Sequence, residues 1–315
     1  MKLLDASTGS LCTVCDLVRF AVTQMAKHKC FFGHGFSNAD EEATFLVTSA
    51  LHLPLASADR FWQAKLLPTE IEHVASLIQK RCEEKVPSAY LTGETWYAGF
   101  RFKSDERALV PRSLLINALE LLQSNMEEDL FPAMPELPEL PKILDLCTGG
   151  GSIAIAVAYR LFDEGRLPKI IGSDLSIKAL ELAKENVAMH ELGKHIKLVQ
   201  GDLFAGLKPS DKFDFILCNP PYVNTSSMKK LPAEYSHEPQ DALEAGNDGM
   251  DFIERLLREL PNRLKTGGAL LLEIGNEGPY FEALVSRLSS DASLQFEFSY
   301  CEVPAGDEMV VLIQT

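Results

Sequence analysis

The spacing of apolar residues divides the chain into three regions. In the first region, apolar positions recur at helical spacing in the stretches 12–25, 40–51 and 69–85. Asn38-Ala39-Asp40 and Pro68-Thr69 provide start signals for the second and third of these helices. We therefore predict a small helical domain over residues 1–88.

The middle region is aromatic and irregular. The run Trp96-Tyr97-Ala98-Gly99-Phe100-Arg101-Phe102, with Gly93 nearby, predicts a β-hairpin that links two domains over residues 89–112. A helix is expected over 113–126. Residues 127–140, which include five acidic residues and three prolines, are predicted to form a surface loop.

The third region alternates strand and helix patterns to the end of the chain. Strands are expected at 142–147, 169–173, 196–200, 213–218, 269–274, 294–300 and 309–314. Helices are expected at 152–161, 177–190, 249–265 and 280–288. Such alternation is typical of a doubly wound α/β fold, so residues 113–315 are predicted to form a Rossmann-like domain with a seven-stranded, mostly parallel sheet.

Composition narrows the classes of function. The formal net charge of −15 disfavours direct nucleic-acid binding, which needs Lys and Arg to neutralise phosphates. It favours a cationic partner, although acidity that only maintains solubility remains an alternative. No apolar run is long enough to span a bilayer, and the start lacks the pattern of a secretory signal, so we expect a cytoplasmic protein without membrane association.

The seven cysteines lack the spacing of a disulfide framework. Cys12 and Cys15 form a lone C-x-x-C inside a helical stretch, where small buried thiols are common. No second pair would complete a metal site, so we expect a structural role and no bound metal.

The first candidate site is the glycine turn Asp145-Leu146-Cys147-Thr148-Gly149-Gly150-Gly151, which lies between an expected strand and an expected helix. Glycines there allow a tight turn and a close approach to a ligand. The spacing is not G-x-G-x-x-G, and a carboxylate at Asp145 would repel the pyrophosphate of a nicotinamide dinucleotide. The positive aminoacyl and sulfonium groups of S-adenosylmethionine fit this carboxylate better.

Two further segments complete a cofactor site. Asp174 follows the second strand of the α/β region and is positioned to accept hydrogen bonds from both ribose hydroxyls, although a helix N-cap is the alternative. After the third strand, Asp202 is expected to bond the exocyclic amine of adenine, with Leu203 packed on the ring.

The most specific signal is Asn219-Pro220-Pro221-Tyr222, directly after the apolar strand 213–218. Amide nitrogens are poor nucleophiles, and two acceptors can orient such a group. Asn219 offers a side-chain carbonyl, Pro220 a free backbone carbonyl, and Tyr222 a flat face for a planar substrate. A turn that merely ends the strand is the alternative. Its register with the glycine turn favours catalysis by orientation.

With these motifs the chain resembles the glutamine N(5)-methyltransferases that modify release factors and ribosomal proteins. It is most similar to the branch that acts on large-subunit ribosomal protein three. Two segments are the more specific marks of this branch. The first is 105–113, which ends in Val110-Pro111-Arg112-Ser113. The second is 231–239, which reads Leu-Pro-Ala-Glu-Tyr-Ser-His-Glu-Pro. The resemblance implies a class I S-adenosylmethionine-dependent methyltransferase fold and N-terminal helices that help to hold the protein substrate.

Within this resemblance two residues depart from the common pattern. Most methyltransferases of this fold have glycine at the position of Cys147, and Gly150 replaces a more usual serine. His237 and Glu238 are interpreted as loop-shaping residues rather than an acid–base pair.

Rival functions remain open at this point. They are methylation of the GGQ loop of peptide-chain release factors, methylation of DNA adenine, and a catalytically silent cofactor-binding scaffold. A nicotinamide dehydrogenase is a further rival, which S-adenosylhomocysteine would fail to stabilise.

Overall fold

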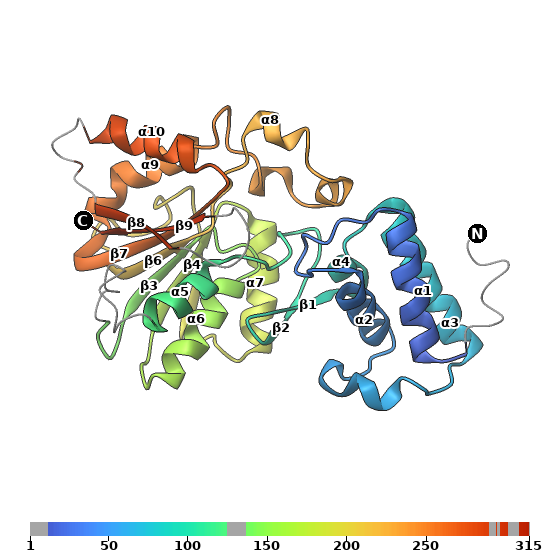
Figure 1. Cartoon of the computed structure of the whole chain (residues 1–315). Helices are drawn as coiled ribbons and strands as arrows, with labels where there is room; N and C mark the ends of the chain where they lie inside the picture. Colours follow the sequence, from blue (N-terminus) through green and yellow to red (C-terminus); the bar gives the residue numbers. More distant parts are fainter. Residues whose placement is uncertain (1–11, 125–136, 290–293, 295–296, 302–308, 315) are drawn as a thin grey trace. The chain divides into compact units, whose positions relative to one another are not determined.

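The computed structural model describes residues 12–124, 137–289, 294, 297–301 and 309–314. They form two compact units (Figure 1). The helical unit comprises the chain up to Glu106 together with Val110–Arg112 and Pro232–Glu238. The sheet unit comprises Arg107–Leu109, Ser113–Leu231 and the chain from Pro239 onward.

Three helices enclose the apolar core of the helical unit. They are α1 (Val14–Lys27), α2 (Ala39–Ala50) and α3 (Pro68–Gln79). The predicted start signals are confirmed, because the Asn38 side chain accepts from the first turn of α2 and Pro68 is the first residue of α3. Leu17, Leu46 and Val74 are fully buried in the core between these helices.

The prediction of one continuous helix through Lys85 is wrong. After α3 the chain forms a single π-helical segment, η3 (Lys80–Glu84), and ends at Lys85 in the left-handed region with φ 62°. This wider turn directs Arg81 and Cys82 into the interior. Helical periodicity alone does not reveal such a change of pitch.

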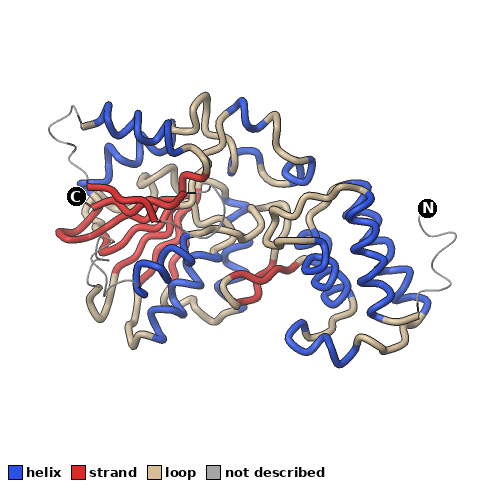
Figure 2. The backbone as a smooth tube through the Cα atoms, viewed as in Figure 1, coloured by secondary structure: helices blue, strands red, loops and turns tan. Residues whose placement is uncertain are grey.

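The sequence pattern predicted only some of the shorter elements of the helical unit. A 3-10 segment, η2 (Leu55–Phe61), and a short helix, α4 (Ser88–Thr92), carry no strong apolar period. The predicted hairpin is formed by β1 (Glu94–Tyr97) and β2 (Phe100–Lys103), which pair antiparallel (Figure 2).

The expectation that Cys12 and Cys15 are buried thiols is wrong. Both are exposed and neither is in a disulfide. Thr13 caps α1, and Val14 and Leu17 face the core, so Cys15 lies on the solvent side of the first turn.

The described part of the sheet unit forms a seven-stranded sheet, as predicted. They are β3 (Lys142–Leu146), β4 (Lys169–Asp174), β5 (Ile196–Gln200), β6 (Phe213–Cys218), β7 (Leu264–Gly275), β8 (Glu297–Cys301) and β9 (Met309–Gln314). Their order in the sheet is β5-β4-β3-β6-β7-β9-β8. The first five in this order are parallel, and β9 runs antiparallel to both of its neighbours.

Helices cover both faces of this sheet (Figure 1). The longer ones are α5 (Leu115–Ser124), α6 (Ser152–Asp163) and α7 (Ile177–Met189) on one face, and α9 (Asp251–Glu259) and α10 (Gly278–Leu288) on the other. Short segments in the connecting loops are α8 (Thr225–Met228), η4 (Ala233–His237), η5 (Gln240–Ala242) and η6 (Leu260–Asn262). Of these, η4 belongs to the helical unit.

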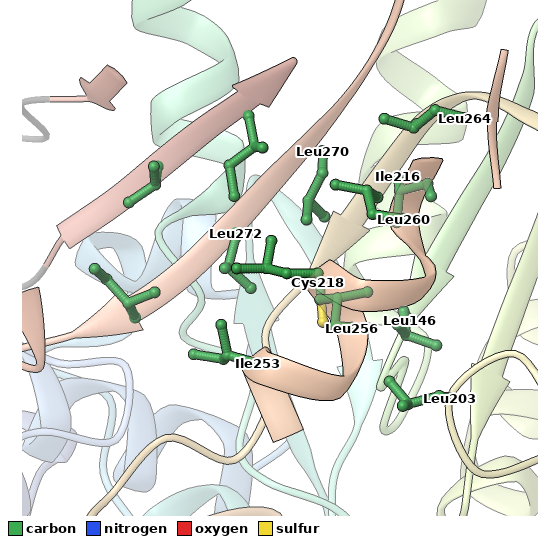
Figure 3. Close-up of a cluster of buried hydrophobic side chains, with 14 of the residues drawn as sticks. Leu146, Leu203, Ile216, Cys218, Ile253, Leu256, Leu260, Leu264, Leu270 and Leu272 are labelled. Atoms are coloured by element: carbon green, nitrogen blue, oxygen red, sulfur yellow. The ribbon is translucent and has the colours of Figure 1, made fainter. Parts of the chain in front are cut away.

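The main core lies between the sheet and the α9–α10 layer. Figure 3 shows Ile253 and Leu256 of α9 against Leu272 of β7 and Cys218 of β6. The prediction that this helix reaches Lys265 is wrong, because Pro261 ends it and β7 begins at Leu264.

Part of the predicted loop 127–140 lies outside the described residues, which resume at position 137. Among the described helices, none combines the length and apolar character of a bilayer-spanning segment.

Candidate cofactor and substrate site

The strand order reverses between β3 and β6. From β3 the chain proceeds outward through β4 to β5, whereas β6 is followed on its other side by β7. Leu146 is the Cα partner of Cys218, so Cys147 and Asn219 leave the sheet as neighbours at its carboxyl edge. This reversal point is where open α/β sheets bind ligands. The two motifs that the sequence singled out therefore meet there.

The glycine turn adopts backbone conformations that explain its composition. Cys147, Gly149 and Gly151 have φ values of 60°, 54° and 81°. A side chain in this left-handed region costs roughly 1–2 kcal/mol. A glycine at position 147 would adopt this conformation without that cost.

The turn packs against α7 on one side and is open on another. The Asn186 side chain donates to the carbonyl of Gly150 at 2.9 Å. A Cβ at Gly151 would come within 3.3 Å of Ala183. At Gly149 the nearest side chain among the described residues would be that of Ala108, at 3.9 Å. The backbone at Gly149 can therefore be approached closely by a ligand.

Asp145 holds the turn from inside the protein. Its Oδ2 accepts from the Thr148 hydroxyl at 2.5 Å and from the Ala154 N–H, in the first turn of α6, at 3.0 Å. The side chain is completely buried, which raises its pKa to about 7. Its Oδ1 has no hydrogen-bond partner in the part of the chain that the structure describes. A buried acceptor without a partner suits a cationic ligand group.

Asp174 lies next to the glycine turn, at the end of β4. Its Oδ2 accepts from the Gly149 N–H and its Oδ1 from the Ser176 N–H, each at 2.8 Å. Burial raises its pKa. The N-cap of α7 is Ser176, which accepts from Ala179. Asp174 is thus not the cap of α7, and its carboxylate lies beside the backbone of Gly149.

Asp202 and Leu203, which were predicted to contact the adenine, both have other partners in the structure. Asp202 forms an exposed ion pair with Arg255 at 2.7 Å, so an adenine amine would compete with a guanidinium for this carboxylate. Leu203 has φ 52° and its side chain packs into the main core.

The segment Asn219–Tyr222 begins directly after β6. Asn219 is partly buried and Pro220 is buried. Within the described residues the Asn219 amide has no hydrogen bond, so its carbonyl remains available to a substrate. The Tyr222 hydroxyl donates to Oε1 of Glu273 at 3.1 Å.

Two glutamates near this segment were missed by sequence reasoning. Glu273, on β7, is 3% exposed, and Glu277, at the start of α10, is 7% exposed. Glu277 accepts from the Asn224 amide at 2.8 Å. A lone charge within the apolar run Ala-Leu-Leu-Leu-Glu-Ile was the available signal, because isolated carboxylates are seldom buried without a purpose.

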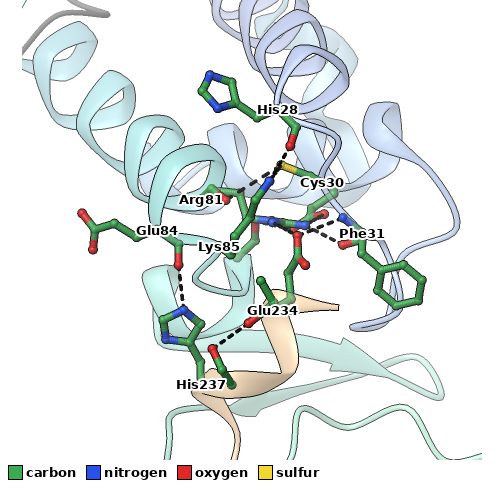
Figure 4. Close-up of polar contacts among 12 residues, drawn as sticks. His28, Cys30, Phe31, Arg81, Glu84, Lys85, Glu234 and His237 are labelled. Atoms are coloured by element: carbon green, nitrogen blue, oxygen red, sulfur yellow. Dashed lines mark hydrogen bonds and ion pairs between the residues drawn. The ribbon is translucent and has the colours of Figure 1, made fainter. Parts of the chain in front are cut away.

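A buried ionic cluster lies within the helical unit. Arg81, which is 1% exposed, donates to both Glu42 oxygens at 2.5 and 3.0 Å. It also donates to Glu234 at 2.9 Å (Figure 4). Although burial opposes ionisation, the Phe31 N–H and Arg81 lower the pKa of Glu234. The cluster therefore anchors the segment Pro232–Glu238 through an ionised carboxylate.

The same segment has a second buried anchor. Both oxygens of Glu238 accept from Arg112, at 2.5 and 2.7 Å. Burial alone would raise the pKa of Glu238, but Arg112 and His34 lower it to about 2. The His237 ring bonds instead to the Glu84 carbonyl at 2.8 Å. His237 and Glu238 thus have separate partners that shape the loop.

A parallel sheet that reverses its order beside a glycine turn is the framework of class I methyltransferases, a class that generally uses S-adenosylmethionine. A family model described as "Methyltransferase small domain" matches residues 120–246. Among solved structures, the catalytic domain of hMettl16 in complex with an RNA hairpin aligns with a TM-score of 0.52 and 15% identity. The alignment covers 80% of this chain and 84% of that one. The fold is that of a class I methyltransferase.

Curated relatives narrow the class further. A ribosomal protein uL3 glutamine methyltransferase from Burkholderia pseudomallei is 42% identical, with 96% of this chain and 94% of the relative covered. Proteins of the same description from Bordetella pertussis and Xanthomonas campestris are 43% and 38% identical. They cover 86% and 98% of this chain, and 87% and 93% of their own lengths are matched. The chain belongs to the family of ribosomal protein uL3 glutamine methyltransferases.

Proposed function

We propose that this protein transfers a methyl group from S-adenosylmethionine to the side-chain amide nitrogen of a glutamine in ribosomal protein uL3. The observation that carries the proposal is the position of Asn219–Tyr222 at the tip of β6, beside the glycine turn that follows β3. The family to which the chain belongs supports this choice of substrate.

The residues around the turn fit S-adenosylmethionine. The open backbone at Gly149 and the neighbouring carboxylate of Asp174 suit the aminoacyl and ribose groups. The partnerless Oδ1 of Asp145 favours positive charge nearby. Cys147, Thr148, Gly150 and Gly151 would form the wall of this site. Asp202 would bond the adenine amine in exchange for its ion pair with Arg255, whereas the Leu203 side chain, which lies in the main core, would not cover the ring. A nucleotide diphosphate would instead meet two carboxylates.

Asn219 and Pro220 would hold the acceptor. When bound, S-adenosylmethionine supplies a methyl group that is activated by a sulfonium. The Asn219 side-chain carbonyl and the Pro220 backbone carbonyl would accept the two amide N–H groups, and the Tyr222 ring would lie against the amide plane. Asn219 and Pro220 thereby direct the nitrogen lone pair at the methyl carbon. Transfer would give the amide nitrogen an N–C bond in exchange for the C–S bond of the donor, and the amide would lose one proton to water.

Charge supports a ribosomal-protein substrate. The chain carries 45 acidic and 30 basic residues, and ribosomal proteins are cationic because they neutralise RNA phosphates. Opposite charge speeds association, most strongly at low salt. We further propose that the helical unit contributes to recognition of this substrate and that the reaction takes place in the cytoplasm.

The test is a comparison of purified acceptors. Wild-type protein and S-adenosylmethionine are incubated separately with uL3, with a peptide-chain release factor and with duplex DNA, and methyl transfer is measured. Tandem mass spectrometry should locate the methyl group on a glutamine of uL3. Faster methylation of the release factor would refute the choice of substrate. Methylation of adenine alone would refute the chemistry.

A further inference from the structure

Tyr222 is fixed through its hydroxyl to a carboxylate that has other donors. Oε1 of Glu273 accepts from the Tyr222 hydroxyl at 3.1 Å. Oε2 accepts from the Ser113 hydroxyl at 2.6 Å and from the Leu114 N–H at 3.0 Å. Because these donors hold both oxygens, the Glu273 carboxylate cannot rotate without breaking several bonds at once.

Two glycines shape the space that Tyr222 occupies. A Cβ at Gly275 would overlap the Tyr222 ring, and a Cβ at Gly249 would overlap the Tyr222 carbonyl. Both glycines have positive φ, 54° and 78°. Tyr222 is therefore seated against backbone on two sides, which leaves its ring little freedom to shift.

A second bond fixes the chain two residues further on. The Asn224 amide donates to Glu277 at 2.8 Å, and its side-chain oxygen accepts from the Ser227 N–H at 2.9 Å in α8. Glu273 and Glu277 flank the turn between β7 and α10. This turn thus holds the chain at positions 222 and 224.

We propose that Glu273 is a positioning residue for methyl transfer, which acts by holding Tyr222 and thereby aiming the acceptor carbonyls of Asn219 and Pro220. This inference rests on the proposed function of those two residues. Two prolines lie between Asn219 and Tyr222. Their fixed φ, together with the restriction of the residue before each proline, makes the link stiff. Fixing Tyr222 at one end therefore limits the orientation of Asn219 at the other.

The experiment is a double-mutant cycle with steady-state methylation of uL3. Tyr222→Phe removes only the hydroxyl, and Glu273→Ala removes the carboxylate. We expect kcat to fall about tenfold in Tyr222→Phe and about 10- to 100-fold in Glu273→Ala, because small misplacements of a reacting group reduce rates this much. The affinity for S-adenosylhomocysteine, measured by calorimetry, should remain unchanged. The double variant should be no slower than Glu273→Ala alone.

Glu273→Gln separates positioning from proton transfer. Glutamine keeps the volume and can still bond to the Tyr222 hydroxyl, which then accepts instead of donating. A positioning role predicts a kcat within about threefold of wild type, by the modest net value of such a bond. A kcat as low as that of Glu273→Ala would overturn the proposal, because a proton acceptor would lose its function in both variants.

The matched control is a second tyrosine–glutamate pair in the sheet unit. The Tyr300 hydroxyl donates to Glu282 at 3.1 Å, between β8 and α10. Tyr300→Phe and Glu282→Ala should leave kcat within about twofold of wild type, as expected for an exposed bond. An equal loss in these variants would contradict a specific role for Glu273.

A measurement that does not depend on enzymatic activity distinguishes failure of the proposed function from failure of the positioning role. Hydrogen exchange of the backbone amides of residues 222–228 should be faster in Tyr222→Phe and Glu273→Ala than in wild type. It should be unchanged in Tyr300→Phe. If wild-type protein methylates no glutamine, the proposed function fails, and exchange still tests the contact. If activity is present but exchange and kcat do not respond, the positioning role fails.

Discussion

Replacement of Arg81 by methionine should destabilise the helical unit strongly. Arg81 donates to Glu42, Glu234 and the Phe31 carbonyl and is 1% exposed. Its loss leaves two buried carboxylates side by side without a counter-ion. Removing one partner of a buried ion pair costs about 3–5 kcal/mol. We expect the free energy of unfolding of Arg81→Met to fall by this amount.

Glu234→Gln should cost less, because the cluster is asymmetric. Without the Glu234 charge, Arg81 keeps Glu42 as a bidentate partner, and the remaining pair is neutral overall. The glutamine oxygen can still accept from the Phe31 N–H, which now donates to Glu234 at 2.9 Å. The loss of one charged hydrogen bond costs about 1.5–3 kcal/mol. The midpoints of these two ranges differ by roughly 2 kcal/mol, so Arg81→Met should be clearly the less stable variant.

The positions of the tryptophans provide the assay. The chain has two tryptophans, and both of them, Trp62 and Trp96, lie in the helical unit. Urea unfolding of the full chain followed by tryptophan fluorescence therefore reports this unit. Arg101→Met is the control, because Arg101 pairs with Glu94 at 3.4 Å and is 56% exposed. Its cost should not exceed about 1 kcal/mol. A cost for Arg81→Met no greater than that for Glu234→Gln would refute the charge argument.

Three further predictions concern the sheet unit. Asn219→Ala should lower the kcat of uL3 methylation about 100-fold, as loss of a transition-state hydrogen bond does. Calorimetry checks that the variant still binds S-adenosylhomocysteine. Near-normal turnover would show that Asn219 does not take part in catalysis. Asp174→Ala should weaken S-adenosylhomocysteine binding at least about tenfold, because charged hydrogen bonds to the ribose are lost; unchanged calorimetric affinity would exclude the ribose role. Asp145 has a pKa raised by burial from 3.8 to about 7, so the folded state retains a proton that the unfolded state releases, and stability falls as the pH rises between these values. Asp145→Asn should lack this decline in unfolding monitored by circular dichroism, and the same pH dependence in both proteins would contradict the assignment.

Most of the sheet could be predicted because its strands are short apolar runs between turn signals. All seven strands overlap their predicted ranges, although β7 begins at Leu264, five residues before its prediction, and β3 and β6 meet at the reversal point. The pitch of the helices and the residues at which they end were harder to predict. The π-helical segment after α3 and the end of α9 at Pro261 depend on tertiary packing and on one imino acid within a helical pattern. Local periodicity averages over such features.

The arrangement of the candidate site was predictable where its residues lie in one motif and unpredictable where distant residues contact one another. Asn219 and Asp174 stand at strand ends, so fold class alone indicates their positions. The bond from Tyr222 to Glu273 spans 51 residues of sequence. The one from Arg81 to Glu234 spans 153. No local pattern encodes such pairs, and only the unusual charge within an apolar run hinted at Glu273.

The chain that follows Tyr222 supplies residues to both units. Variants along it should therefore affect either stability or kcat. Residues 222–224 are fixed by Glu273 and Glu277 within the sheet unit. Glu234 and Glu238, a few residues later, are fixed within the helical unit by Arg81 and Arg112. Because the two sets of bonds are separate, losing Glu234 should lower stability with little effect on cofactor affinity. Losing the Tyr222 hydroxyl should lower kcat with little effect on tryptophan-monitored unfolding. A single variant that changes both to the same degree would show that the two sets are energetically coupled.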